Sequence, residues 1–193
     1  NFIDWIHNKQ FRLTDGTLAR NRPHKNTLWL DDLFMSVPAL AQMGKLTGEQ
    51  KYFDDAVKQV QLFAKRMFVK EKGLYMHGWV QEMEDHPAFY WGRANGWAMV
   101  STAEVLSSMP EEHPKYNAVL SVLRKHIEGI IPLQAESGLW RQVLDHPELW
   151  EETSCTAMFT YVISRAINRG WIDKSNLAVA QKALTGLNQK ITE

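Results

Sequence analysis

Three stretches of the chain are almost free of charged residues. Residues 33–44 and 154–164 carry no charge, and residues 96–109 carry only Glu104. A helix that is apolar nearly all round is usually buried. We therefore expect three inner helices, near residues 28–45, 94–109 and 153–169.

Charged stretches alternate with these apolar ones. Residues 49–72 carry ten charges, interleaved with apolar residues at helical spacing. This pattern predicts an amphipathic outer helix near residues 50–70. Residues 116–133 and 175–191 repeat the pattern, the latter more weakly, and predict further outer helices near 113–132 and 174–191.

A glycine turn recurs between each outer helix and the next inner one. The turns read DGTLAR, KGLYMH and SGLWRQ, with Gly16, Gly73 and Gly138 spaced by 57 and then 65 residues. Such a period indicates a repeating unit of outer helix, turn, extended loop and inner helix. The repeat predicts an all-α fold in a single domain over residues 1–193. Its form is part of a double-layered helical toroid, with only short strands at the glycine turns.

Composition narrows the classes of partner. The 22 basic and 22 acidic residues balance, and no Lys/Arg block exists, so neither nucleic acid nor a membrane is expected as a partner. The lone Cys155 excludes an intrachain disulfide and fits a reducing compartment, so we expect a cytoplasmic location. The sequence contains no metal-ligand spacing and no nucleotide loop, so we predict neither metal nor cofactor. A small molecule or a sugar is the expected ligand.

The loops that precede the inner helices carry the candidate chemistry. They read RPHKNTLWLDD, YMHGW with FYWGRANGW, and LWEETSC. In a toroid these loops converge on one mouth, where the helix N-termini direct partial positive charge. Aromatic faces, a guanidinium and a carboxylate together are the chemistry of a site for an acidic sugar.

The acids among these residues each have a structural alternative. Asp31 and Asp32 stand in the first turn of a predicted helix, where the helix dipole favours acids by about 0.3–1 kcal/mol each. We therefore read Asp32 as structural, whereas Asp31 is a catalytic candidate as well. Glu151 and Glu152 are also explained as acids that favour the start of the third inner helix.

The remaining candidates have alternatives too. Trp91 and Trp97 fit a ligand site or the core equally well. Arg93 fits a ligand-facing cation or a surface salt bridge. His77 and His24 are ordinary loop histidines or substrate contacts. The location of all these groups at one end of the inner helices favours the ligand site.

Three motifs together resemble glycoside hydrolase family 105, the unsaturated rhamnogalacturonyl hydrolases. They are TLWLDDLFMSVPAL, WGRANGW and TSCTAMFTYVI, and the likeness runs from about residue 12 to residue 172. Family 88, the unsaturated glucuronyl hydrolases, is more distantly similar. The resemblance implies an (α/α)6 barrel of six hairpins, of which this chain would supply about half. We therefore expect an internal piece of a longer bacterial protein, whose exposed inner surface would favour self-association.

The resemblance also implies a reaction. Enzymes of this family hydrate the C4=C5 double bond of the unsaturated uronic acid that pectin lyases leave at a non-reducing end. By motif matching, Asp31 would be the acid and then the base. The family pattern also includes a second aspartate, and this chain begins after that position. The residues that would contact the substrate are Trp29, Met35, His77, Trp91, Arg93, Trp97 and, less directly matched, His24.

Two other readings remain open at this point. One is a conventional inverting glycosidase, or a polysaccharide lyase, on the same toroid. An inverting enzyme needs a second carboxyl about 6.5–9.5 Å from the first, and only Glu151 or Glu152 could supply it. The other is a helical-repeat protein that binds carbohydrate without turnover and presents a shallow, solvated face.

Overall fold

The computed structural model describes residues 2–191. The helices are α1 (Phe2–Asn8), α2 (Leu30–Thr47), α3 (Gln50–Met67), α4 (Gly92–Ser108), α5 (Tyr116–Ile130), α6 (Thr153–Asn168) and α7 (Leu177–Asn188), with short 3-10 turns at Ile131–Leu133 and Lys174–Asn176. The strands are β1 (Thr27–Trp29), β2 (Phe68–Val69), β3 (Leu74–Tyr75), β4 (Gly78–Val80), β5 (Trp140–Arg141) and β6 (Glu151–Glu152). The predicted all-α class is confirmed, and the strands are short.

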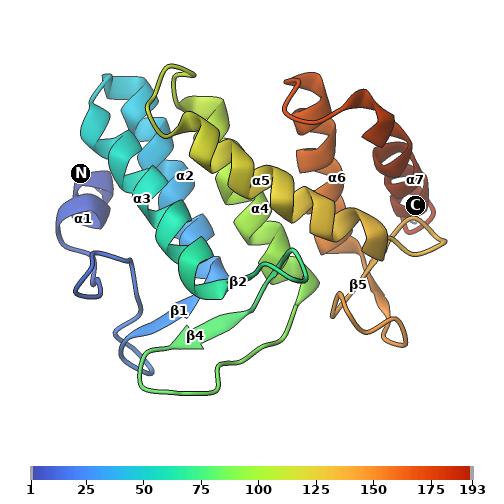
Figure 1. The fold of residues 1–193 in the computed structure, drawn as a ribbon, viewed down its shortest axis with the longest axis horizontal. Coiled ribbons are helices and arrows are strands. Elements are labelled where there is room, and N and C mark those ends of the chain that lie inside the picture. The colour runs from blue at the N-terminus through green and yellow to red at the C-terminus, as the bar shows by residue number, and fades with distance from the viewer. Residues whose placement is uncertain (1, 192–193) are drawn as a thin grey trace.

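The helices form two layers. Helices α2, α4 and α6 pack side by side as the inner layer, and α3, α5 and α7 each pack against the inner helix that precedes them. Figure 1 shows the inner helices beginning at the same end of the molecule, where β1, β4 and β5 also lie. The alternation predicted from charge is therefore confirmed. The outer helices α5 and α7 begin three residues later than expected.

Glycines allow the inner helices to approach closely. A Cβ added at Gly96 of α4 would lie 2.4 Å from Met158 Sδ of α6, and one at Gly92 would lie 2.8 Å from Cys155 Sγ. Both distances are shorter than real Cβ contacts, so a larger residue would push α4 and α6 apart. The small residues of the WGRANGW motif thus set the distance between two inner helices.

The glycine turns need the left-handed backbone that glycine adopts most easily. Gly16, Gly73 and Gly138 have φ angles of 89°, 67° and 90°. β2 and β3 pair antiparallel across the turn at Gly73. A Cβ at Gly73 would also lie 2.7 Å from the Cα of Gly129 in α5, so this turn is held tightly against the outer layer.

One pairing was not predicted. β1 and β4 pair antiparallel, with Trp29 opposite Gly78 and Thr27 opposite Val80. This pairing joins the loop before α2 to the loop before α4. Within residues 2–191, every helix is too short or too polar to cross a bilayer.

Candidate active site

The candidate site lies where the inner helices begin. β1 leads directly into α2, and its pairing with β4 brings Trp29 beside His77, the residue before β4. Their ring centroids are 5.4 Å apart. His77 in turn meets Trp91 edge to face, at 5.0 Å, and the guanidinium carbon of Arg93 lies 4.8 Å from the Trp91 ring centroid. Residues from β1, from the β3–β4 connection and from the start of α4 therefore form one continuous group.

Three buried polar atoms in this group lack a hydrogen-bond partner among the described residues. They are Oδ2 of Asp31, Nδ1 of His77 and Nε1 of Trp91. Buried polar atoms are nearly always paired, because an unpaired one costs about 1–3 kcal/mol. Three such atoms in neighbouring loops mark a polar surface suited to a ligand.

His77 provides a neutral imidazole in this surface. Burial lowers the pKa of His77, and this effect exceeds the opposing attraction of the Asp31 charge. At neutral pH the ring therefore carries one N–H donor and one acceptor nitrogen. Asp31 stands in the first turn of α2, two residues after Trp29, so its carboxyl lies at the same end of the inner layer as the imidazole.

Asp32 has a different role from its neighbour. Its Oδ2 accepts hydrogen bonds from Arg20 Nε at 2.6 Å and from the backbone N of Trp29 at 3.3 Å. The side chain thus caps the start of α2, which confirms its structural interpretation. Arg20 was missed by the sequence analysis, since no spacing connects it with Asp32. Its guanidinium carbon lies 3.7 Å from the Trp29 ring centroid.

Arg93 forms an ion pair and remains accessible. Its Nη1 is 3.5 Å from Glu152 Oε1 and 3.4 Å from Ser154 Oγ. The salt-bridge alternative for Arg93 is therefore realised, with a partner that the sequence analysis had not assigned. The Arg93 side chain is 39% exposed, so the rest of the guanidinium can reach a ligand.

Glu152 is a helix cap. Its Oε2 accepts a hydrogen bond from the backbone N of Cys155 at 2.6 Å, and its Oε1 accepts one from the Ser154 hydroxyl. Burial raises the pKa of Glu152, but these hydrogen bonds and the charge of Arg93 outweigh burial and leave the pKa below its usual value. The interpretation of Glu152 as an acid at the helix start is confirmed.

Asn95 supports the site from beneath. This fully buried side chain donates to the backbone O of Trp91 and both donates to and accepts from the backbone of Tyr75. His126 of α5 donates from Nε2 to Asn95 Oδ1 at 3.0 Å, since that oxygen can only accept. The network ties the start of α4 to β3 and to the outer layer. Asn95 lies inside the quoted motif, but sequence alone gave no partner for it.

The other predicted contact residues, Trp97, Met35 and His24, differ in burial and in location. Trp97 packs against Phe34 of α2, with ring centroids 4.4 Å apart, so it takes part in contact between inner helices. Met35 is 68% exposed. His24 borders a separate depression with Val80, at the end of the β1–β4 pair that is remote from Trp29. The geometry thus groups Trp29, His77, Trp91 and Arg93 more closely than the other predicted contacts.

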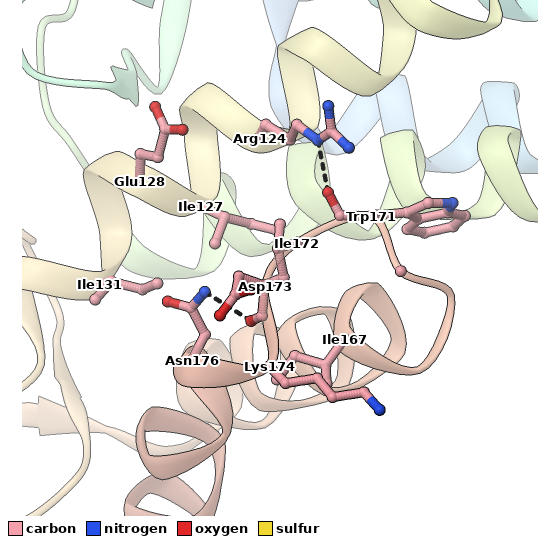
Figure 2. Close-up of a pocket in the computed structure, with 11 residues that line it drawn as sticks. Arg124, Ile127, Glu128, Ile131, Ile167, Trp171, Ile172, Asp173, Lys174 and Asn176 are labelled. Carbon is pink, nitrogen blue, oxygen red and sulfur yellow. Dashed lines mark hydrogen bonds between the residues drawn. The ribbon is translucent and has the colours of Figure 1, made fainter.

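A second depression, of about 680 Å³, lies on the outer layer between α5 and the α6–α7 connection (Figure 2). Arg124 Nε donates to the backbone O of Trp171 at 2.6 Å, and Asn176 Nδ2 donates to the backbone O of Asp173. The first bond joins α5 to the α6–α7 connection, and the second is local to that connection. Within the described chain, no group of three metal-ligating side chains could hold a metal ion.

Comparison with known proteins places the chain among carbohydrate-active enzymes. A family model described as Glycosyl Hydrolase Family 88 matches residues 1–193. The chain is 29% identical, over 86% of its length, to an unsaturated 3S-rhamnoglycuronyl hydrolase of Alteromonas sp., and 32% identical, over 67%, to the unsaturated rhamnogalacturonyl hydrolase YesR of Bacillus subtilis. It covers 41% and 38% of those proteins.

A solved structure extends the likeness to the fold. The crystal structure of "a possible member of GH105 family" from Salmonella enterica superposes with a TM-score of 0.91 and 30% identity, over 98% of this chain and 52% of that one. The chain therefore spans about half the length of this structure and less than half that of the two curated relatives. The resemblance predicted from three motifs is confirmed, as is the prediction of part of an (α/α)6 barrel.

Proposed function

The chain belongs to glycosyl hydrolase family 88, and on that premise we propose that it carries the catalytic face of a hydrolase for oligosaccharides that end in a 4,5-unsaturated uronic acid. The names of its relatives support this substrate class. Because the chain spans less than half of those relatives, the proposal concerns the protein at its native length. For the finer substrate we propose unsaturated galacturonyl oligosaccharides from rhamnogalacturonan, as for the relative named a rhamnogalacturonyl hydrolase.

The proposed reaction is hydration rather than direct displacement at the anomeric carbon. Asp31 gives its proton to C4, and the positive charge that develops at C5 is shared with the ring oxygen. Water then adds to C5 and returns a proton to the Asp31 carboxylate. The resulting hemiketal opens by breaking the bond between C5 and the ring oxygen. This leaves a ketone at C5 and a hemiacetal at C1, from which the neighbouring sugar departs. Asp31 finishes in its initial protonation state.

The single observation that carries this proposal is the position of the Asp31 carboxyl. Its Oδ2 is buried without a partner among the described residues, at the start of α2 next to Trp29 and thus beside His77, whereas Oδ2 of the adjacent Asp32 accepts from Arg20 and from the backbone N of Trp29. Asp31 thus keeps a buried, unpaired oxygen for a substrate, whereas Asp32 is tied to Arg20 and to the start of its own helix. A general acid needs such a free oxygen within hydrogen-bond reach of its target.

We assign the neighbouring residues to binding. The exposed part of the Arg93 guanidinium would bind the uronate carboxylate, because a guanidinium fork matches a carboxylate. His77 and Trp91 would satisfy their unpaired nitrogens on ring hydroxyls. The negative charge of Glu152 partly offsets the positive charge of Arg93. Arg93 would therefore bind the carboxylate without being an isolated cation before substrate binds.

An inverting glycosidase would need Glu151 or Glu152 as its second carboxyl, and both side chains are engaged in other contacts. Glu152 caps α6 and pairs with Arg93, and hydrogen bonds hold it ionised. Glu151 is engaged elsewhere, since its Oε1 accepts a hydrogen bond from the Ser137 hydroxyl and lies 3.5 Å from Arg141 Nη1. These contacts argue against either acid as the general base that activates water in an inverting enzyme.

Turnover in deuterium oxide tests the proposed reaction. With an unsaturated galacturonyl–rhamnose disaccharide, the ultraviolet absorbance of the conjugated double bond should fall, and the ketone product should carry deuterium at C4. A saturated galacturonyl disaccharide is the matched control and should not be cleaved. Release of an uronic acid that keeps its double bond would show direct hydrolysis instead. Binding without turnover would favour the carbohydrate-binding alternative.

A further inference from the structure

The unsaturated uronyl ring carries too little stereochemistry for an enzyme to tell which uronic acid it came from. Galacturonic and glucuronic acids differ only at C4, and a double bond between C4 and C5 removes that difference. An enzyme for such rings must therefore distinguish its substrates by the anomeric linkage or by the sugar beyond it. The residues beside the uronyl site consequently decide specificity.

The hairpin of β5 and β6 lies next to the loop of Trp91 and Arg93, beside the proposed uronyl site. Trp140 pairs with Glu152 and Arg141 with Glu151, and the backbone N of Gln142 donates to the backbone O of Trp150 at 2.9 Å, which extends the ladder by one step. Gln142 O also accepts from the backbone N of Gly92, at the start of α4. The backbone of Trp150 is therefore fixed relative to the loop of Trp91 and Arg93.

Alternation along the strand sets the direction of Trp150. Side chains two residues apart share one face of a strand, roughly 7 Å apart. Glu152 points to Arg93, with 3.5 Å between charged atoms, and its cross-strand partner Trp140 is fully buried. Trp150 lies one ladder step beyond β6, so the same alternation would place its side chain on the face of Trp140 and Glu152, on the side of Arg93.

Trp150 is held open to solvent at this point. Its side chain is 65% exposed, although its backbone is hydrogen-bonded and Arg141 Nη1 binds the preceding carbonyl of Leu149. A large indole on a fixed backbone offers apolar area at a small entropic cost, since few rotamers are lost when a ligand covers it. The backbone of Gln142 lies opposite that of Trp150, and its side chain would supply an amide for sugar hydroxyls.

We infer that Trp150 forms the platform on which the sugar next to the unsaturated uronyl ring stacks, with Gln142 beside it. This subsite rests on the proposed function, because it extends the same substrate by one residue from Arg93. The step from Glu152 to Trp150 is comparable with the length of one sugar unit. The subsite selects substrates by their second sugar, which is the part that the unsaturated ring leaves unspecified.

Two substrates separate the subsite from the uronyl site. They are an unsaturated galacturonyl–rhamnose disaccharide and the methyl glycoside of the same unsaturated uronic acid, assayed with the protein at its native length. For each variant the ratio of kcat/KM for the disaccharide to kcat/KM for the methyl glycoside is measured. Trp150→Ala should lower this ratio about tenfold, the size of a lost aromatic stacking contact. Trp150→Phe should restore most of it.

The matched control is Trp5→Ala. Trp5 is another exposed tryptophan, at 51%, on α1. Trp5→Ala should leave both kcat/KM values, and therefore their ratio, unchanged. An unchanged ratio in Trp150→Ala, or an equal loss in Trp150→Phe, would overturn the subsite while leaving the uronyl site intact. If the unsubstituted enzyme consumed neither double bond, the proposed function itself would fail, and the subsite with it.

Discussion

Arg20 stacks over the indole of Trp29, with its guanidinium carbon 3.7 Å from the ring centroid, while its Nε donates to Asp32. One side chain thereby fixes both the aromatic ring before α2 and the acid that caps α2. The guanidinium lies over the ring of Trp29, whose centroid is 5.4 Å from that of His77 in the candidate site. Arg20 therefore orients a residue that would contact the substrate, without being expected to contact it itself.

Removal of Arg20 should loosen Trp29. In Arg20→Ala the cation–π contact and the bond to Asp32 are both lost, and a cation–π contact contributes about 0.5–1 kcal/mol at an exposed site. We expect KM for the unsaturated disaccharide to rise about three- to tenfold with little change in kcat. Arg20→Lys, which keeps the charge next to Asp32, should show a smaller rise. Steady-state kinetics of both variants check this, and an equal loss of kcat in each would contradict it.

The buried amide of Asn95 should dominate the stability of the region below the site. Asn95→Ala leaves the backbone N and O of Tyr75 without their partners in the core. Each unpaired buried group costs about 1–3 kcal/mol, so the free energy of unfolding should fall by roughly 2–4 kcal/mol. Urea denaturation measures the change. The control is Asn8→Ala, whose exposed amide binds the backbone O of Asp4 and whose loss should cost little.

His126 should make the fold sensitive to mild acid. Full burial lowers its pKa from 6.5 to about 3. Between these values the unfolded chain binds the extra proton and the folded chain does not, so the free energy of unfolding decreases as pH falls below about 6.5. One such group contributes up to about 1.4 kcal/mol per pH unit.

The variant His126→Gln tests this pH dependence. Glutamine can still donate to Asn95 but cannot titrate, so unfolding free energies measured in urea at pH 6.5, 6 and 5 should change less steeply with pH than those of the unsubstituted protein. Asn8→Ala is the control, because it removes an exposed hydrogen bond and no titrating group, and it should leave the slope unchanged. A slope that persists in full in His126→Gln would show that other groups cause the acid sensitivity.

Glu152 should prove to be a cap and not a catalytic acid. In Glu152→Gln the amide oxygen can still accept from the backbone N of Cys155, whereas the charge opposite Arg93 is lost. We expect kcat to stay within about tenfold, well short of the 10²–10⁴-fold loss that removal of a general acid or base causes. Glu151→Gln provides the neighbouring control. A loss of a hundredfold or more in kcat for Glu152→Gln alone would revive the inverting mechanism.

The layers of the fold could be read from the sequence because they follow from local patterns. Helices with long uncharged stretches, such as the one around Leu40, are buried, amphipathic ones such as that around Val60 cover them, and the glycine turns recur between the two. Helix periodicity and left-handed turns are properties of a few neighbouring residues, so one sequence suffices to show them. The pairing of β1 with β4 depends on segments about fifty residues apart, and no local pattern predicts it.

The site was predicted in part for the same reason. Trp91 and Arg93 are close in sequence and could be grouped at once, whereas the roles of Arg20 and of Glu152 as a partner of Arg93 arise only through folding. The structural role of Asp32 was predicted, because the first turn of a helix favours an acid there. That Oδ2 of Asp31 is buried and unpaired could not be predicted, since it depends on how separate loops pack around it.

The comparison of Asp31→Asn with Asp32→Asn tests the proposed mechanism most directly. Both variants replace one carboxyl by an amide of the same size in adjacent positions, and turnover is followed by the ultraviolet absorbance of the unsaturated disaccharide with the protein at its native length. Asp31→Asn should lower kcat by about 10²–10⁴-fold while the disaccharide still binds. Asp32→Asn should keep kcat within about tenfold and lose roughly 1 kcal/mol of stability with its bond to Arg20. Normal turnover in Asp31→Asn, or abolished turnover in Asp32→Asn alone, would contradict the assignment.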